Sequence, residues 1–229
     1  HLRNDIYFQD NGAFPEGKGR RMTAKDVAYS FRRIIDPATA SSGAWIFNSR
    51  VDPSHPFTAL NDSTFQLKLI KPFHPILGVL SMQYCSIVPK EVVEKYGKDF
   101  RSHPCGTGPF QLVAWEEGQA IIMKKNPGYF ERDSAGNRLP YLDGIKITFL
   151  ENKATEFLEF EQQRLEFVND IDPSFKDEVL SKSGELRPDW KGKIVLQKHP
   201  YLTTEYFGIL MDTTKNLVKN SPLRDVRVR

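Results

Sequence analysis

The amino-acid sequence predicts an α/β fold, and three observations support this prediction. The chain has 229 residues, of which 39% are hydrophobic and 27% charged, as in ordinary globular proteins. In some segments apolar residues recur at helical spacing, and in others they alternate with polar residues. The two kinds of segment follow one another along the chain, which favours helices packed on a sheet.

The first elements are a strand, a turn and a helix. Residues 2–8 alternate weakly, and residues 10–12 have the Asp-Asn-Gly composition of a turn. Thr23 predicts a helix start because its side chain can accept from free N–H groups, and Asp26 complements the positive helix end. Apolar residues then recur at helical spacing until residues 36–37, where Asp-Pro ends the helix.

Further elements follow from the same patterns. Residues 65–70 predict a half-buried strand, and a short helix is expected from Pro89 to Gly97. The second half predicts a hairpin, one more strand, a helix, a short helix from Ser174 and two late strands. These elements cover residues 110–115 with 119–124, 145–150, 154–165, 194–197 and 206–211.

A Pro- and Gly-rich stretch at residues 103–109 separates two parts of the chain that differ in their pattern of predicted helices and strands. This change predicts a domain boundary. Within it, Gly106, Thr107 and Gly108 lack the lysine and following helix of a phosphate-binding loop. We expect these three residues to have a hinge or interdomain role, because glycines permit close approach of two backbones. The predicted domains are therefore residues 1–104 and 105–229.

Charge and composition disfavour several classes of protein. The 32 basic and 29 acidic residues are interspersed and leave a net charge of +3, so we expect no nucleic-acid partner. The histidines are scattered, and Cys85 and Cys105 match no metal-binding spacing, so neither metal nor cofactor is expected. The two cysteines could form a disulfide or remain buried thiols.

No segment has the length and apolar composition of a membrane-spanning helix or the pattern of a signal peptide. Both ends look cut, because the first residues already form a strand pattern and the last stop in mid-pattern.

Catalytic motifs are absent from the sequence. There is no Gly-x-Ser-x-Gly elbow and no His-Glu-x-x-His helix. Paired carboxylates occur at Glu116 with Glu117 and at Glu159 with Glu161, but a turn and the wet face of a helix favour a solvated surface over acid/base chemistry. Trp45 and Phe47 lie in an irregular stretch without periodic partners, where aromatic side chains either pack or line a cleft.

Several short motifs, in this order and spacing, resemble those of the family 5 solute-binding proteins of ABC importers, which bind peptides or nickel. They occupy residues 2–12, 22–30, 87–90, 106–110 with Trp115, 125–130 and 221–229. Two segments depart from the family pattern: residues 14–21 form a longer turn, and residues 163–166 lack the usual Gly and Asp.

The resemblance implies a type II periplasmic-binding-protein-like lobe with an additional small α+β domain. Residues 1–104 would form the extra domain and the edge of lobe one, residues 105–229 the main part of lobe one, and the second lobe would be absent. The regions matching ligand-proximal parts of relatives hold Trp45, Phe47, Met82 and Tyr84.

The implied function is extracytoplasmic capture of peptides or other small solutes for a membrane ABC permease, without catalysis. The resemblance also implies a monomer that is periplasmic or at the cell surface, where a lipoprotein anchor is an option. Two alternatives remain: a hydrolase using a carboxylate pair, and a ligand-sensing module of the same fold without a transport role.

Overall fold

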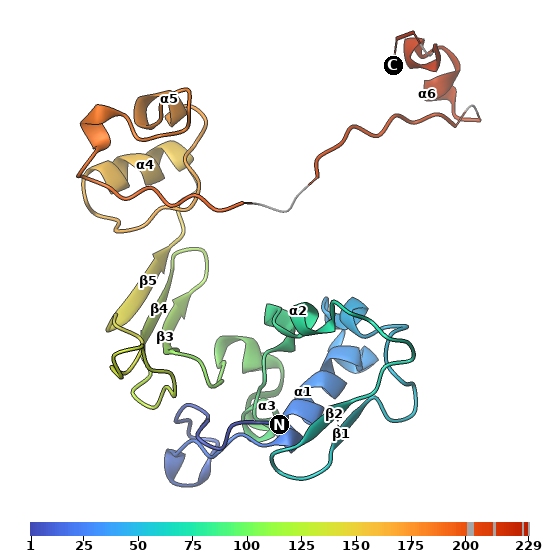
Figure 1. Cartoon of the computed structure of the whole chain (residues 1–229), viewed down its shortest axis with the longest axis vertical. Coiled ribbons are helices and arrows are strands. Elements are labelled where there is room, and N and C mark those ends of the chain that lie inside the picture. Colours follow the sequence, from blue (N-terminus) through green and yellow to red (C-terminus); the bar gives the residue numbers. More distant parts are fainter. Residues whose placement is uncertain (201–203, 213, 226, 229) are drawn as a thin grey trace. The chain divides into compact units, whose positions relative to one another are not determined.

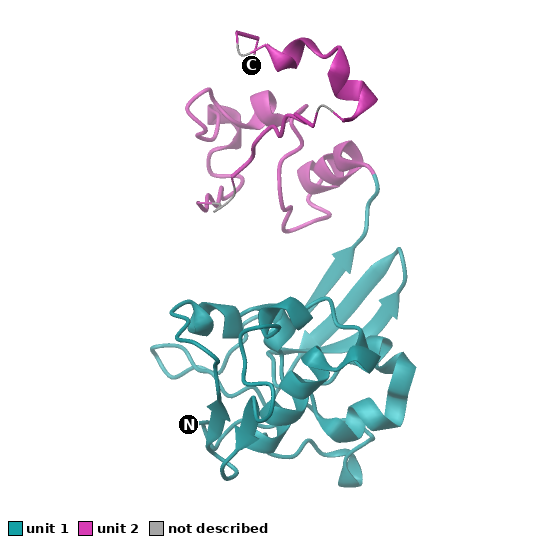
Figure 2. Ribbon diagram, turned by 90° about the vertical axis from the view of Figure 1, so that its right-hand side faces the viewer, with its two compact units in different colours: residues 1–151 teal, residues 152–229 magenta. Residues whose placement is uncertain are grey.

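The computed structural model describes residues 1–200, 204–212, 214–225 and 227–228, and the chain divides into two compact units (Figures 1 and 2). Unit 1 comprises His1–Glu151 and unit 2 comprises Asn152–Arg229. This division after residue 151 is not the lobe boundary that the sequence predicts between residues 104 and 105. The lobe boundary concerns the whole protein and stays a prediction. The motif at 221–229 includes residues 226 and 229, which lie outside the described part.

The α-helices of the described chain are α1 (Ala24–Ile35), α2 (Ile76–Leu80), α3 (Lys90–Tyr96), α4 (Lys153–Glu161), α5 (Lys176–Val179) and α6 (Asn216–Lys219). The strands are β1 (Phe57–Ala59), β2 (Phe65–Leu67), β3 (Phe110–Glu116), β4 (Ala120–Lys125) and β5 (Gly144–Thr148). None of these helices is long and apolar enough to cross a lipid bilayer.

Within the described residues the strands form two antiparallel sheets, both in unit 1. The first pairs β1 with β2, and the second has the order β3-β4-β5 (Figure 1). The predicted hairpin is confirmed, since Phe110 pairs with Lys125 and Glu116 with Ala120.

Several boundaries differ from the prediction. The predicted strand at residues 2–8 reduces to one bridge between Tyr7 and Arg21. Helix α4 ends at Glu161 instead of continuing to residue 165, and Gln163 just beyond it has a positive φ of 59°. The strands predicted at 194–197 and 206–211 are wrong for the described chain, where neither segment is a strand. A strand requires a paired edge, and an apolar run alone does not supply one.

Helix α1 places its apolar face against β1 and β2, as its spacing predicts. Phe31 lies at the centre, with ring centroids 5.1 Å from Phe47 and 5.5 Å from Phe57. We call this group the α1 core; its buried members are Val27, Ala28, Phe31, Ile34, Ile46, Phe47, Val51, Phe57 and Cys85. Tilted and edge-on contacts between these rings add to the burial of apolar surface.

A charged network, the Arg20 network, joins α1 to α3. The guanidinium of Arg20 donates to both carboxylate oxygens of Asp26, at 2.9 and 2.6 Å, and to Glu91 at 2.6 and 2.9 Å. Arg20 also lies over the ring of Phe8, with its Cζ atom 5.3 Å from the centroid. Asp26 is buried, so the network fixes the start of α1 from inside the fold.

One glycine is required by a close backbone approach. A Cβ atom added at Gly19 would lie 1.8 Å from the carbonyl oxygen of Phe8. A side chain at position 19 would therefore displace the local backbone. It would also move the neighbouring Arg20, whose guanidinium bonds to α1.

Thr23→Ala should lower the free energy of unfolding by about 1 kcal/mol. Asp26 accepts from the backbone N–H of Thr23 at 2.8 Å and from its hydroxyl at 2.9 Å, so the threonine orients the acid at the helix start. Chemical denaturation of the wild type and the variant measures the change. Thr23→Ser retains the hydroxyl and should recover most of the loss; equal losses for Ala and Ser would contradict this role.

Candidate functional site

The candidate ligand residues come from two segments of unit 1. Trp45 lies in a 3-10 turn, Ala44–Ile46, whose backbone is held by the N–H of Ile46 donating to Gly43. Tyr84 lies in a second 3-10 turn, Gln83–Cys85, which Met82 begins. Both turns are irregular and short, so the side chains project according to local hydrogen bonds and not according to a helix or strand period.

The two segments meet at an aromatic pair. The rings of Trp45 and Tyr84 have centroids 6.5 Å apart at an interplanar angle of 80°, an edge-on arrangement. Gly43 permits this contact, because an added Cβ would lie 2.8 Å from the Cβ of Tyr84. The structure therefore brings together two residues that the sequence placed in separate ligand-proximal regions.

We call the Trp45–Tyr84 ring pair, together with Met82 two residues before Tyr84, the Trp45 surface. Trp45 is 48% exposed and Met82 36% exposed, whereas Tyr84 is half-buried. Large apolar side chains left this open offer contact area to an apolar group of a ligand. Their role as ligand contacts stays a prediction.

Phe47 does not share this surface. It is fully buried in the α1 core, with ring centroids 5.1 Å from Phe31 and 4.9 Å from Phe57. Its side chain has no accessible area for a ligand, so the sequence-based assignment of Phe47 as a ligand contact is corrected to core packing.

Arg50 is a neighbour of Trp45 that the sequence did not identify. Its Nη1 atom donates to the carbonyl oxygens of Trp45 at 2.6 Å and Ile46 at 3.1 Å. Its guanidinium also lies over the rings of Trp45 and Phe73. No local sequence signal marks an arginine that bonds back to a preceding turn.

The segment with Gly106, Thr107 and Gly108 is held by two buried amides. Gln9 donates from Nε2 to the carbonyl oxygens of Gly108 at 3.2 Å and Phe110 at 2.7 Å, and Asn126 donates to Gly108 at 2.8 Å. A Cβ added at Gly106 or Gly108 would meet no atom within 4 Å, so close backbone approach is not what these glycines provide within unit 1. Their interdomain role stays a prediction.

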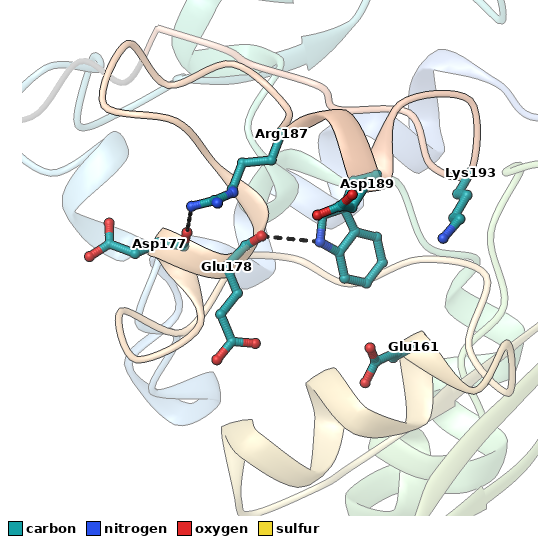
Figure 3. Close-up of a pocket in the computed structure, with 7 residues that line it drawn as sticks. Glu161, Asp177, Glu178, Arg187, Asp189 and Lys193 are labelled. Atoms are coloured by element: carbon teal, nitrogen blue, oxygen red, sulfur yellow. Dashed lines mark hydrogen bonds between the residues drawn. The ribbon is translucent and has the colours of Figure 1, made fainter.

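One cavity of unit 2 has a volume of about 490 Å³, and Figure 3 shows the residues that line it. Trp190 donates from its indole to the carbonyl of Glu178, and Arg187 donates to the carbonyl of Asp177. Glu161, Asp189 and Lys193 complete the lining, so the cavity is mainly charged. A smaller cavity of about 320 Å³ in unit 1 is lined by residues that include Tyr7, Gln9, Gln111 and Asn126.

One member of each candidate carboxylate pair forms an ion pair with an arginine. Glu117 bonds to Arg101 at 2.8 Å, and Glu159 bonds to Arg164 at 2.8 Å. Both interactions lie at the surface, where ion pairs are solvated.

Cys85 and Cys105 are free and buried, and they belong to different core clusters. Of the two options left open by the sequence, the structure therefore contains the buried thiols. Burial raises the pKa of both thiols, and that of Cys105 reaches about 11.

Comparison with curated proteins finds relatives whose names describe ligand binding. The glutathione-binding protein GsiB of Escherichia coli O1:K1 is 28% identical over 144 residues, which are 63% of this chain and 25% of GsiB. The chain thus matches about a quarter of the length of this relative.

Solved structures give the same fold. DppA from Helicobacter pylori, an ABC transporter-associated periplasmic binding protein in complex with the peptide STSA, is 27% identical with a TM-score of 0.65, covering 78% of this chain and 36% of DppA. MoaA from A. tumefaciens R10, in complex with mannopinic acid, is 29% identical with a TM-score of 0.60, covering 72% of this chain and 30% of MoaA. The type II periplasmic-binding-protein fold is therefore confirmed.

A family model described as "Bacterial extracellular solute-binding proteins, family 5 Middle" matches residues 1–229, the entire chain. This match agrees with the sequence motifs and with the fold of the solved relatives. The chain belongs to the family 5 bacterial extracellular solute-binding proteins.

Proposed function

We propose that this chain acts in the substrate-binding component of an ABC importer that captures peptides. The observation that best supports the proposal is the family match over residues 1–229. Two relatives favour peptides as the solute, since GsiB is named for glutathione and DppA holds the peptide STSA. Mannopinic acid in MoaA indicates that the same fold accepts other small solutes.

In this proposal, Trp45, Met82 and Tyr84 contact the solute. A half-exposed tryptophan set edge-on to a tyrosine offers a rigid apolar surface and loses little conformational entropy on binding. Tyr84 packs against the α1 core, which contains Phe47. An extended peptide would gain further affinity from backbone hydrogen bonds, which do not select among side chains.

Transport would follow from a change in conformational populations. A ligand that binds a closed form more tightly shifts the protein towards that form, which a membrane permease can then recognise. The component would work as a monomer without a cofactor, in the periplasm or at the cell surface, with a lipid anchor as one means of attachment. No bond of the solute is broken in this scheme.

Trp45→Ala in the full-length protein should weaken peptide binding about tenfold or more, because a central aromatic contact is removed. Isothermal titration with glutathione and with the peptide STSA measures the change. Leu60→Ala is the control, since Leu60 is an exposed apolar residue of unit 1 outside the Trp45 surface. Equal affinities of the wild type and Trp45→Ala would contradict the assignment of the site.

Further measurements with the same two peptides separate the alternative functions. Cleavage of either peptide by the wild type would favour the hydrolase. Ligand-induced thermal stabilisation without any support of uptake would favour the sensing module. Absence of binding to both probes would contradict the peptide part of the proposal.

A further inference from the structure

Arg50 is tethered at both its backbone and its side chain. Its carbonyl oxygen accepts from the N–H of Ile70 at 2.8 Å, beside the bridge between Val51 and Leu69. Its Nη1 atom donates to the carbonyls of Trp45 and Ile46, two residues of the turn that carries the tryptophan. Arg50 thereby connects the position of Trp45 to the sheet edge next to β2.

The guanidinium group lies against two aromatic rings. The Cζ atom is 5.9 Å from the ring centroid of Trp45 and 5.2 Å from that of Phe73. Both distances fall within the range at which a cation is attracted to a ring face. Because the Arg50 guanidinium already faces the Trp45 ring, a cationic group of a ligand would be attracted to that ring less strongly.

The positive charge of Arg50 has no carboxylate partner within the described residues. Its Nε and Nη2 atoms have no hydrogen-bond acceptor in that part of the chain. Asp52, two residues further on, is occupied by Lys68 at 2.8 Å and by the N–H groups of Ser54 and His55. An uncompensated cation therefore stands beside the Trp45 surface.

We propose that Arg50 is a positioning and specificity-determining residue of the candidate ligand site. It holds the Trp45 ring in place, and its charge disfavours cationic groups there. The site then takes solutes that present an uncharged apolar or aromatic side chain to Trp45, in preference to lysine or arginine side chains. The inference rests on the proposed function and deepens it by naming the class of side chain.

The expected discrimination is moderate. A unit charge about 8 Å from a ligand cation, at a surface that retains much of the screening of water, changes affinity about three- to tenfold. Salt weakens this effect, because the Debye length is about 8 Å at physiological ionic strength. Contact area with Trp45 alone would show no such salt dependence.

The test compares tripeptides of alanine carrying one leucine or one lysine at each of the three positions. Their affinities for the full-length wild type, Arg50→Gln and Arg50→Lys are measured by isothermal titration at low and high salt. Wild type should prefer the best leucine peptide over the best lysine peptide, and Arg50→Gln should reduce this preference about three- to tenfold. Arg50→Lys retains the charge and should retain most of the preference.

A second readout requires no ligand. Trp45, Trp115 and Trp190 labelled with 5-fluorotryptophan give fluorine resonances that single Trp→Phe substitutions assign. The Trp45 resonance should move in Arg50→Gln and in Arg50→Lys, because both lose the planar fork that bonds the turn. Circular dichroism and melting temperature show whether each variant is folded.

The outcomes separate the two proposals. An unchanged leucine-to-lysine preference in folded Arg50→Gln overturns the specificity role, and an unmoved Trp45 resonance overturns the positioning role. If the wild type binds none of the tripeptides, the specificity role is overturned, whereas the titrations with glutathione and the peptide STSA decide peptide binding separately. The fluorine resonance still decides positioning in that case.

Discussion

Phe47→Ala should lower the free energy of unfolding by about 3–5 kcal/mol. The side chain is fully buried between Phe31 and Phe57, so truncation removes apolar contacts on more than one side. The loss has two parts: the transfer free energy of the missing ring, and the cavity that neighbouring rings fill only partly. Denaturant titration of the chain measures the change. An unchanged slope of the unfolding transition shows that the shift in midpoint reports stability.

Trp45→Ala is the matched control for this prediction. Trp45 is two residues away in the same irregular segment, but it is 48% exposed. Its truncation should cost much less stability while weakening ligand binding. The assignment of Phe47 to the core and Trp45 to the surface would be wrong if the two variants lost similar stability.

Asp26→Ala should lower the free energy of unfolding by about 2–3 kcal/mol at neutral pH, less than for a fully buried pair because Arg20 is 35% exposed. The change leaves the guanidinium of Arg20 in a half-buried place with Glu91 as its remaining carboxylate partner. It also removes the acceptor for the N–H of Thr23 at the start of α1.

The pH dependence of this loss has a definite sign. Burial raises the pKa of Asp26, but hydrogen bonds from Arg20 and Thr23 outweigh burial and hold the pKa below its ordinary value. A lowered folded-state pKa gives stability that is present above the unfolded-state pKa of about 3.9 and is lost as pH falls through the folded-state value.

The stability difference between the wild type and Asp26→Ala should therefore shrink in acid. Chemical denaturation at pH 7 and across the acid range measures it. Asp5→Ala is the control, because Asp5 forms an exposed pair with Arg3 and should change stability little at any pH. A difference for Asp26→Ala that stays constant down to the lowest pH would contradict the charged role of this residue.

Local signals explain which elements could be predicted from the sequence. Helix α1 was predictable because Thr23, the apolar period and the Asp-Pro pair at residues 36–37 all act within the segment itself. The hairpin of β3 and β4 was predictable for the same reason, since its strands are joined by a short turn. The segments 194–197 and 206–211 have strand-like composition, but strand formation depends on a partner edge elsewhere.

The candidate site could be predicted only in part. The resemblance to family 5 led to Trp45 and Tyr84, and the structure shows that their rings meet. It could not separate Trp45 from Phe47, because a 3-10 turn of three residues is too short for a periodic pattern to assign one residue to the core and another to the surface. Arg50 was missed because its contacts with Trp45 and Phe73 depend on tertiary folding.

Burial protects the two thiols of unit 1 from oxidation and disulfide exchange. Disulfide exchange and oxidation proceed through the thiolate, and burial raises the pKa of Cys105 to about 11, so the thiolate is scarce at neutral pH. The Sγ atom of Cys105 also faces the carbonyl of Gln9 inside the fold, where an oxidant or a second thiol has no access without local opening. Cys85 is likewise buried within the α1 core. Covalent modification of either thiol thus requires opening of the surrounding core, and the two cysteines become reporters of local unfolding.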